Sequence, residues 1–325
     1  MPTAPPDLPA LAAAVRAAPG LRAKRDLDLL DRLSPAPAAP GPDGDDAAAI
    51  PHGDGFLLVC AEAIAPALLA ADPFAAGAAA VATNVADIRA MGGRPVALVD
   101  TLVSPDRDHA AHVLDGLAWA AGLLGVPIAG GHLTIGGAPA LSASCTGTAR
   151  ALLRARDARP GDVLLAAFSV EGRWRDLGTP VFSSLAVREP AKLREDGEAL
   201  VEVAEAGLCR AARDVSMPGV AGSLLQMLEL TGGCGATLDL DRLPRPREVP
   251  IEEWLVMFPS FGFVLAAPPE HAVAAVAAFT RRDLACAACG AFDGSGVLRL
   301  AAGGATAEVW DLAAQALTRP RPGAR

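Results

Sequence analysis

The stretch Val81–Asp100, VATNVADIRAMGGRPVALVD, decides the fold. Its first part is predicted to be a helix of small apolar residues that ends at Gly92 and Gly93, and its last part, VALVD, a buried strand. A helix that ends at paired glycines and leads into a strand is typical of α/β proteins. Asn84 and Asp87 are unusual there, since polar residues three positions apart share one face of a helix. They are either solvated or part of a site.

The segments before this stretch predict a helix start and a β-hairpin. Asp72 and Pro73 fit the N-cap and first-turn positions of the long helix. Further upstream, the apolar runs AAAI and FLLVCAE flank a turn at residues 52–55, which is typical of a hairpin. Two adjacent carboxylates, Asp45 and Asp46, precede this hairpin.

The segments after it predict a second helix and two further strands. We expect Ser104 to cap this helix, Pro105 to lie in its first turn and Gly125 to follow its end. VPIAGGHLTIGG is predicted to be a strand followed by a glycine turn, and ALSASCTGTA another strand. The order β-β-α-β-α-β-β indicates a mixed α/β layer rather than a Rossmann repeat.

The chain is expected to contain two α/β halves of similar size. Residues 8–33 are predicted to be helical, and residues 34–43 form a linker rich in proline and glycine. We place the boundary between the halves at about residues 150–160, ahead of the strand in ARPGDVLLAAF. The expected organisation is an N-terminal helix and linker at 1–43, one domain at 44–155 and a second domain at 156–325.

The second half has a clear pattern of helices and strands. A long helical region is predicted from about Pro190 to Ala212, and Asp214 is predicted to begin the next, apolar helix. A strand in FGFVLAAP, a helix in EHAVAAVAAFT and closing strands near GVLRL and ATAEVWD follow. These elements again alternate between helix and strand, as in an α/β domain.

Composition excludes several classes of protein. The 325 residues carry a net charge of −9 without a basic block, which argues against a nucleic-acid partner. Charged residues and prolines interrupt the apolar runs, so no membrane helix is predicted. No signal-peptide order is present at the start, and six dispersed cysteines suit a reducing compartment, so the cytoplasm is the expected location. A polyanion such as a nucleotide would need metal ions to approach this acidic chain.

Familiar catalytic motifs are absent. The sequence has no P-loop, no dinucleotide-binding glycine motif after a strand and no nucleophile elbow. Gly130 and Gly131 could cradle a phosphate, although such glycines are more often plain turns. Cys286 and Cys289 stand alone, and zinc needs about four ligands, so we expect no zinc site there.

The residues that do indicate a functional site are carboxylates. Each has an ordinary explanation as a turn former, strand end, solvated residue or helix cap. Mutually repelling carboxylates converge mainly around a hard cation, and Mg²⁺ bound by carboxylates and phosphate oxygens is the common case. Spacing alone supports only a divalent-metal hypothesis. The candidates are Asp45, Asp46, Glu62, Asp87 and Asp214.

Several motifs, in order, resemble one superfamily. GDDAAAI, VCAEAI, NVADIRAMGGRP, GGHLT, TGTA and ARDVSMPGVAGSLLQMLELTGGCGATLDLDRLP are similar to motifs of the aminoimidazole ribonucleotide (AIR) synthetase superfamily. That superfamily includes thiamine-monophosphate kinase, selenophosphate synthetase and a hydrogenase maturation factor. The resemblance runs from about residue 24 to 312. The pattern is most similar to a bacterial branch described as AIR synthase-related.

The resemblance implies a homodimeric, ATP-utilising enzyme without a P-loop. Its fold would be α+β with two AIR synthase-like domains: an N-terminal mixed sheet that forms a barrel between subunits and a C-terminal α/β domain. ATP would be held through Mg²⁺ by acidic residues. The implied metal ligands are Asp45, Asp46, Glu62, Asp87 and Asp214. The implied nucleotide contacts are Asp45, Asp46, Asn84, Asp87, Gly130 and Gly131. The implied catalytic residues are Lys24, His132 and Asp214.

Departures from the family motifs decide the subfamily. His132 stands where thiamine-monophosphate kinases have an acid, and Met217 replaces their second acid after Asp214. Selenophosphate synthetases need an N-terminal nucleophilic cysteine beside a lysine, whereas the first cysteine here is Cys60, inside a strand. Lys24 could instead be a solvated helix residue, and His132 could simply bond backbone in a turn.

The sequence therefore predicts a Mg²⁺-dependent enzyme that phosphorylates or activates an oxygen of a small metabolite. One alternative is a nucleotide-binding regulatory or scaffold protein without turnover. Another is an activity like that of thiamine-monophosphate kinase or selenophosphate synthetase.

Overall fold

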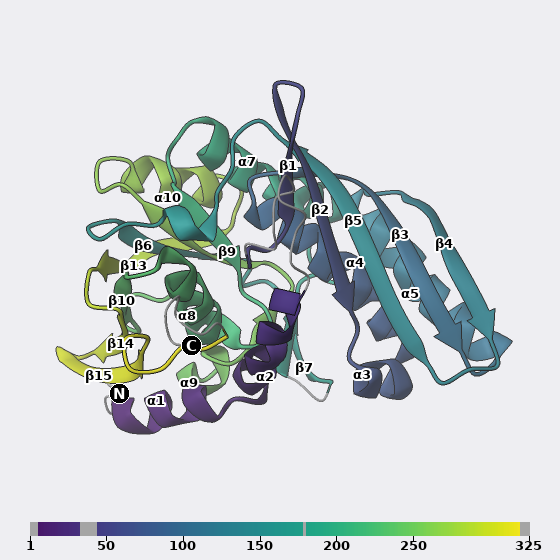
Figure 1. Ribbon diagram of the computed structural model, residues 1–325, viewed down its shortest axis with the longest axis horizontal. Helices are drawn as coiled ribbons and strands as arrows, with labels where there is room; N and C mark the ends of the chain where they lie inside the picture. The colour runs from purple at the N-terminus through teal and green to yellow at the C-terminus, as the bar shows by residue number, and fades with distance from the viewer. Residues whose placement is uncertain (1–5, 33–43, 178–179, 319–325) are drawn as a thin grey trace.

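The computed structural model describes residues 6–32, 44–177 and 180–318, and the predicted linker at 34–43 lies outside these ranges. Two halves, each built on its own β-sheet, lie side by side (Figure 1). The mixed α/β architecture predicted from the sequence is confirmed. Within the described ranges, no helix is both long and apolar enough to cross a membrane.

The first half contains a five-stranded sheet in the order β1-β2-β5-β3-β4. Neighbouring strands are antiparallel except for the parallel pair β3 and β4. The predicted hairpin is confirmed as β1 and β2, which join at residues 52–55. Figure 1 shows helices α4 and α5 against one face of the sheet. The bounds are β1 (Ala48–His52), β2 (Gly55–Ala63), α3 (Pro66–Ala71), α4 (Pro73–Ala90), β3 (Arg94–Ser104), α5 (Arg107–Leu124), β4 (Ile128–Ile135) and β5 (Ala140–Ala149).

Helices α4 and α5 pack closely because glycines lie at their contact. A Cβ atom on Gly77 of α4 would lie 2.1 Å from the Val113 carbonyl oxygen, and one on Gly116 of α5 would lie 2.0 Å from the Phe74 carbonyl oxygen. The predicted start of α4 is confirmed, since the Asp72 side chain accepts a hydrogen bond from the Ala75 N–H. These contacts fix the position of the helix that carries Asp87.

Two local predictions in the first half are wrong. The N-cap of α5 is Asp106, which accepts from the His109 N–H, whereas Ser104 ends β3 and Pro105 precedes the helix. Gly125 does end the helix in a left-handed conformation, as predicted. Residues 128–135 form one continuous strand rather than a strand and a glycine turn, because pairing with β3 continues through the two glycines.

The second half is built on a seven-stranded sheet in the order β15-β14-β10-β13-β6-β12-β9. The predicted strands near FGFVLAAP, GVLRL and ATAEVWD are confirmed. The bounds are β6 (Val163–Phe168), α6 (Pro190–Asp196), α7 (Glu198–Glu205), β9 (Ala211–Asp214), α8 (Gly219–Thr231), β10 (Gly235–Asp239), α9 (Ile251–Trp254), β12 (Gly262–Ala267), α10 (Ala272–Thr280), β13 (Ala285–Asp293), β14 (Val297–Ala302) and β15 (Ala305–Asp311), with a short 3-10 helix η2 (Ala155–Asp157) before β6.

The prediction that Asp214 begins a helix is wrong. The helical region ends at Glu205, and Asp214 is the last residue of strand β9, which pairs with β12. Helix α8 begins only at Gly219. Pairing with the buried strand β12 outweighs the helical preference of the alanine-rich segment before Asp214. Asp214 therefore lies at the end of the edge strand β9, with its side chain buried.

A small three-stranded sheet, β11-β8-β7, was not predicted. Its strands are only two to four residues long, which leaves little periodicity in the sequence. They are β7 (Arg173–Asp176), β8 (Pro180–Ser183) and β11 (Phe258–Pro259).

The N-terminal helices pack against the second half. They are α1 (Leu8–Ala17), α2 (Pro19–Ala23) and the 3-10 helix η1 (Lys24–Arg32), in agreement with the predicted helical segment. Leu11 and Leu21 belong to the same hydrophobic core as α8. A Cβ atom on Gly20 would lie 2.1 Å from the Met217 carbonyl oxygen, so α2 lies directly on the segment that follows Asp214. This contact places Lys24 at the junction of the two halves.

Candidate functional site

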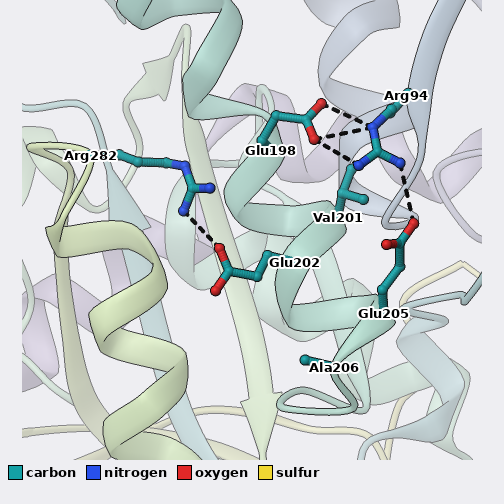
Figure 2. A pocket seen from close by; sticks show the side chains of 7 residues that line it. All are labelled: Arg94, Glu198, Val201, Glu202, Glu205, Ala206 and Arg282. Carbon is teal, nitrogen blue, oxygen red and sulfur yellow. Dashed lines mark hydrogen bonds and ion pairs between the residues drawn. The ribbon is translucent and has the colours of Figure 1, made fainter.

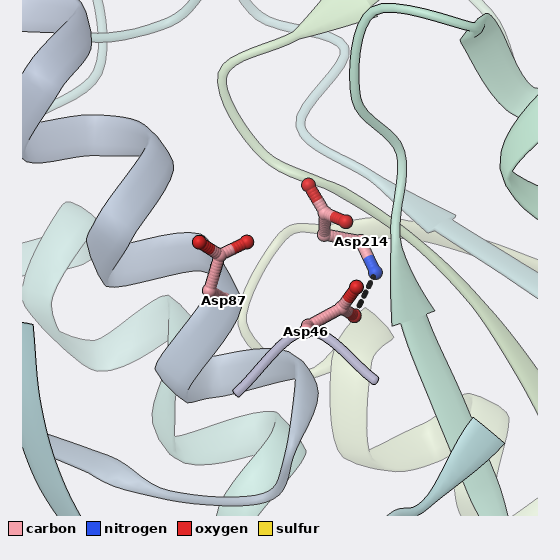
Figure 3. A group of neighbouring side chains, drawn as sticks. All are labelled: Asp46, Asp87 and Asp214. Atoms are coloured by element: carbon pink, nitrogen blue, oxygen red, sulfur yellow. Dashed lines mark hydrogen bonds between the residues drawn. The ribbon is translucent and has the colours of Figure 1, made fainter. Parts of the chain in front are cut away.

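Three carboxylates converge where the two halves meet. Asp46 lies before β1, Asp87 lies in α4, and Asp214 ends β9. One oxygen atom from each lies within 4.8 Å of the others, and Figure 3 shows the three side chains turned toward one another. The first two belong to the first half of the chain and Asp214 to the second. The structure thus brings together three acids separated by up to 168 positions.

Hydrogen bonds from the second half orient Asp46. Its Oδ2 accepts from the backbone N–H of Asp214 at 3.0 Å, and its Oδ1 lies 3.3 Å from Nη2 of Arg213. Arg213 is itself buried, and its Nη1 also donates to the Gly44 carbonyl oxygen. The end of β9 therefore holds the segment before β1 in place.

Asp87 is buried, and its carboxylate is not fully hydrogen-bonded. Its side chain is 6% exposed, and its Oδ2 has no hydrogen-bond partner among the described residues. Burial, followed by the nearby charges of Asp214, Glu62 and Asp46, raises the pKa of Asp87 well above its usual value. The pKa of Asp214 is likewise raised, first by burial and then by Asp46. Such a group of acids is stabilised by a proton or by a cation.

The donors in this cluster fit a hard divalent cation. All three candidate ligand atoms are carboxylate oxygens, which Mg²⁺ and Ca²⁺ prefer. The unpaired Oδ2 of Asp87 supplies a buried oxygen that lacks a partner within the described chain. Thiol and imidazole ligands, which zinc often uses, do not belong to this group. The residues present thus fit Mg²⁺ better than a softer metal.

Lys24 and Glu62 lie close to the cluster. The positive charge of Lys24 acts on Glu62, Asp87 and Asp214, where it opposes the rise in pKa. Glu62 lies near the end of β2, and desolvation of its carboxyl group raises its pKa. Lys24 is half-buried and thus partly accessible to an anion at the cluster.

Asp45 and Asn84 are engaged in bonds within the chain. The carboxylate of Asp45 accepts hydrogen bonds from the backbone N–H groups of Asp46 and Ala155, so it joins the segment before β1 to the start of η2. Asn84 is fully buried; its Nδ2 donates to the Ala80 carbonyl oxygen. Direct contacts of either residue with a metal or nucleotide stay predictions.

Cys60 lies beside the buried acids but is not an activated nucleophile. Its Sγ lies 3.4 Å from the Asn84 Oδ1, where it donates a weak hydrogen bond. Burial, followed by the charge of Asp87, raises the pKa of the Cys60 thiol. A thiolate is the reactive form of cysteine, so this environment suppresses reactivity.

Gly130, Gly131 and His132 lie apart from the carboxylates within one chain. They belong to edge strand β4, which is separated from β2 by β5 and β3. Three strand spacings amount to roughly 14 Å. The ring of His132 contacts the Thr134 hydroxyl at 3.3 Å, a side-chain contact rather than the backbone bond in a turn considered from the sequence. Their predicted roles in nucleotide binding and catalysis stay predictions.

Arg213 was not among the site residues predicted from the sequence. It is the one arginine within β9, Ala211–Asp214, between apolar residues and Asp214. A charged residue in such a short buried strand indicates a buried ion pair. Its acidic partner, Asp46, is 167 positions away and could not be identified from spacing.

Comparisons with known proteins show which family the chain is similar to. The family described as AIR synthase related protein, N-terminal domain, matches residues 44–149, and the corresponding C-terminal domain family matches residues 159–302. An uncharacterised protein of Synechocystis is 38% identical over 85% of both chains.

The chain belongs to the AIR synthase-related family.

Solved structures share the fold. Thermotoga maritima PurL complexed with ADP superposes with a TM-score of 0.70 at 23% identity, covering 85% of this chain and 46% of PurL. The same protein complexed with ATP also gives a TM-score of 0.70 at 23% identity, covering 84% of this chain and 47% of PurL. The AIR synthase-related chain thus spans about half the length of the PurL chain that it matches.

Proposed function

We propose that this protein is a Mg²⁺-dependent enzyme that uses ATP to phosphorylate or activate an oxygen of a small metabolite. The observation that carries the proposal is the convergence of Asp46, Asp87 and Asp214, with a buried Asp87 oxygen that lacks a partner in the described chain. PurL, a relative with the same fold, is solved in complexes with ADP and ATP, which supports a nucleotide as the ligand here.

Electrostatics favours a nucleotide that arrives with metal. The carboxylate oxygens lie within 4.8 Å of one another, and two ionised groups at that upper bound repel each other by about 3.5 kcal/mol at an effective dielectric constant of about 20. An ATP triphosphate would add further negative charge to this cluster. Asp46, Asp87 and Asp214 would hold Mg²⁺, which would supply charge neutralisation of the phosphates when bound. Glu62, at the exposed end of β2, is a further candidate ligand.

The residues of the chain would then position the reacting groups. Lys24 supplies an ammonium group near the acids, where it can contact a phosphate oxygen. Arg213 and the Asp214 N–H keep the Asp46 carboxylate in one orientation. Phosphoryl transfer depends mainly on position and charge neutralisation, so a preorganised group of this kind is suited to it. The acceptor oxygen would gain the γ-phosphoryl group, and ADP would leave.

We further propose a homodimer in which the open faces of two five-stranded sheets meet. Leu98 points to the helices and is buried, whereas its neighbour Val99 is 47% exposed on the opposite face. Ile50 on β1 is also exposed, and His132 pairs in register with Thr101, two residues after Val99. An uncovered, partly apolar sheet face is typical of an association surface.

Turnover assays test the proposed chemistry. Purified protein with Mg²⁺ and ATP would be screened against small metabolites that bear hydroxyl, carboxyl or amide oxygens, and ADP or phosphate release would be measured. At least one metabolite should stimulate release in the wild-type protein but not in Asp46→Asn. Tight ATP binding without stimulation by any metabolite would favour the alternative, a nucleotide-binding regulatory protein.

Two specific activities are disfavoured. The buried Cys60, with its raised pKa, does not provide the nucleophile that a selenophosphate synthetase-like reaction needs, although a selenide, water dikinase of Myxococcus xanthus is 31% identical over 63% of this chain. Met217 replaces the second acid expected of a thiamine-monophosphate kinase.

A further inference from the structure

A cavity lined by arginines lies where the end of α4 and the start of β3 meet the end of α5 and the helices α6 and α7. Its volume is about 190 Å³, and its charged lining consists of Arg89, Arg94, Arg194 and Glu198. A water molecule occupies about 30 Å³ in the liquid, so the cavity has room for a small solute. Three positive groups and one negative group give this lining an excess of positive charge.

Arg89 is buried in this lining without a carboxylate of its own. Arg89 is 7% exposed. Within the described chain its side chain makes one hydrogen bond, which Nη2 donates to the Leu193 carbonyl oxygen at 3.0 Å. A guanidinium group has five N–H donors, so most of its donor capacity is unused. An arginine side chain keeps its positive charge at neutral pH.

The nearby carboxylates are bound to other arginines. Asp196 accepts two hydrogen bonds of 2.7 Å from Arg188. Glu198 accepts from Nε and Nη2 of Arg94, and Nη1 of Arg94 donates to Glu205, as Figure 2 shows from the adjoining hollow. The positive charge of Arg89 is therefore not matched by a dedicated acid.

Arg194 completes the cationic wall. Its Nε and Nη2 donate to the Leu123 and Gly122 carbonyl oxygens at the end of α5, and its Nη1 has no hydrogen bond within the described residues. These bonds offset the negative end of the helix dipole, which would otherwise repel an anion.

Glycines allow the arginines to come this close. A Cβ atom on Gly197 would lie 2.2 Å from Nε of Arg89, although the backbone of Gly197 is helical and would accept any residue. A Cβ atom on Gly125 would lie 3.1 Å from the Arg194 side chain. The absence of side chains at these two positions keeps both guanidinium groups beside the cavity.

We infer that this cavity is a binding site for a phosphate-type oxyanion, either free or as the phosphate group of a metabolite, held mainly by Arg89 and Arg194. Guanidinium groups match the geometry of phosphate oxygens and form charge-assisted hydrogen bonds with them. The site joins α4 of the first half to α6 and α7 of the second. It is separate from the proposed nucleotide site, because Arg89 and Asp87 are two positions apart in α4 and point to different sides.

Calorimetry on the full chain tests this site. Inorganic phosphate would be titrated in buffer that contains a chelator, because without metal the acidic cluster repels anions and cannot supply the signal. Arg89→Gln should abolish binding, and Arg194→Gln should weaken it roughly 10- to 100-fold, the loss expected for one hydrogen bond between charged groups. Glu198→Gln should strengthen binding, since it removes the negative lining group and releases Arg94.

Matched controls decide the outcome. Arg299→Gln, on β14 of the second half, removes a partly exposed arginine outside the cavity and should leave phosphate binding unchanged. Phenyl phosphate distinguishes a free phosphate ion from the phosphate group of a metabolite as the natural ligand. Tighter binding of phenyl phosphate than of phosphate would assign the cavity to a metabolite, and weaker binding would assign it to the free ion. Either result supports the site. No heat of binding for either compound, or equal loss in Arg194→Gln and Arg299→Gln, would overturn the inference. If Arg89→Gln does not fold, Arg194→Gln and Glu198→Gln still carry the test.

Discussion

Asp87→Asn should make the metal-free protein more stable, and the gain should grow with pH. The substitution keeps the size of the side chain and removes its charge from a group of carboxylates within 4.8 Å of one another, where two ionised groups at that upper bound repel each other by about 3.5 kcal/mol. In the folded wild-type protein the pKa of Asp87 is raised well above its usual value, first by burial. The folded state therefore binds more protons than the unfolded state at intermediate pH.

The sign of the pH effect follows from that difference. Below the unfolded pKa of about 3.9, the raised pKa carries no penalty because both states are protonated. As pH rises from there toward the raised folded pKa, the wild-type protein loses about 1.4 kcal/mol of stability per pH unit from this group. Asp87→Asn lacks this loss, so its advantage over wild type should increase across the same window.

Thermal unfolding in the presence of a chelator, at several pH values from about 5 to 8, measures this advantage. A change of 1 kcal/mol shifts the midpoint by roughly 2–4 °C for a unit of 150–250 residues. Asp115→Asn, on the exposed surface of α5, is the matched control and should show no such trend. An advantage of Asp87→Asn that is constant or falls as pH rises would refute the reasoning.

Three further predictions address other parts of the structure. Lys24→Gln should weaken Mg²⁺-dependent ATP binding at least about tenfold in calorimetry, because one charged hydrogen bond is lost; unchanged affinity would exclude the phosphate contact. Gly77→Ala should destabilise the protein by about 1–3 kcal/mol in thermal unfolding, since its Cβ would clash with the Val113 carbonyl. Gly122→Ala, in open space on α5, is the control, and equal midpoints for the two would contradict the packing argument. Val99→Asp should give folded monomers in light scattering where wild type forms dimers; a dimeric variant would move the interface elsewhere.

The sequence predicts the elements of the first half well because their signals are local. Asp72 before Pro73, the turn at 52–55 and Gly125 each act through contacts within a few residues, and all three lie where the pattern indicates. Asp214 was misplaced because the same alanine-rich segment suits a helix or a buried strand. Pairing of β9 with β12, about 50 residues later, decides between them, and no local pattern records that pairing.

The site was predictable as a set of acids but not as a geometry. Asp46, Asp87 and Asp214 were candidates from their motifs, and the fold brings these three together. Asp45, from the same motif, instead accepts a hydrogen bond from the backbone N–H of Ala155. The partner of Arg213 could not be anticipated, since its contact with Asp46 arises only when the two halves are assembled.

The most direct test of the proposed Mg²⁺–nucleotide site is calorimetric titration of ATP into the purified protein, with and without Mg²⁺. ATP binding to wild type should require Mg²⁺ and should be lost in Asp87→Asn, while Asp115→Asn should bind like wild type. ATP binding of equal affinity in the presence of a chelator, or in Asp87→Asn with Mg²⁺, would contradict the proposed site.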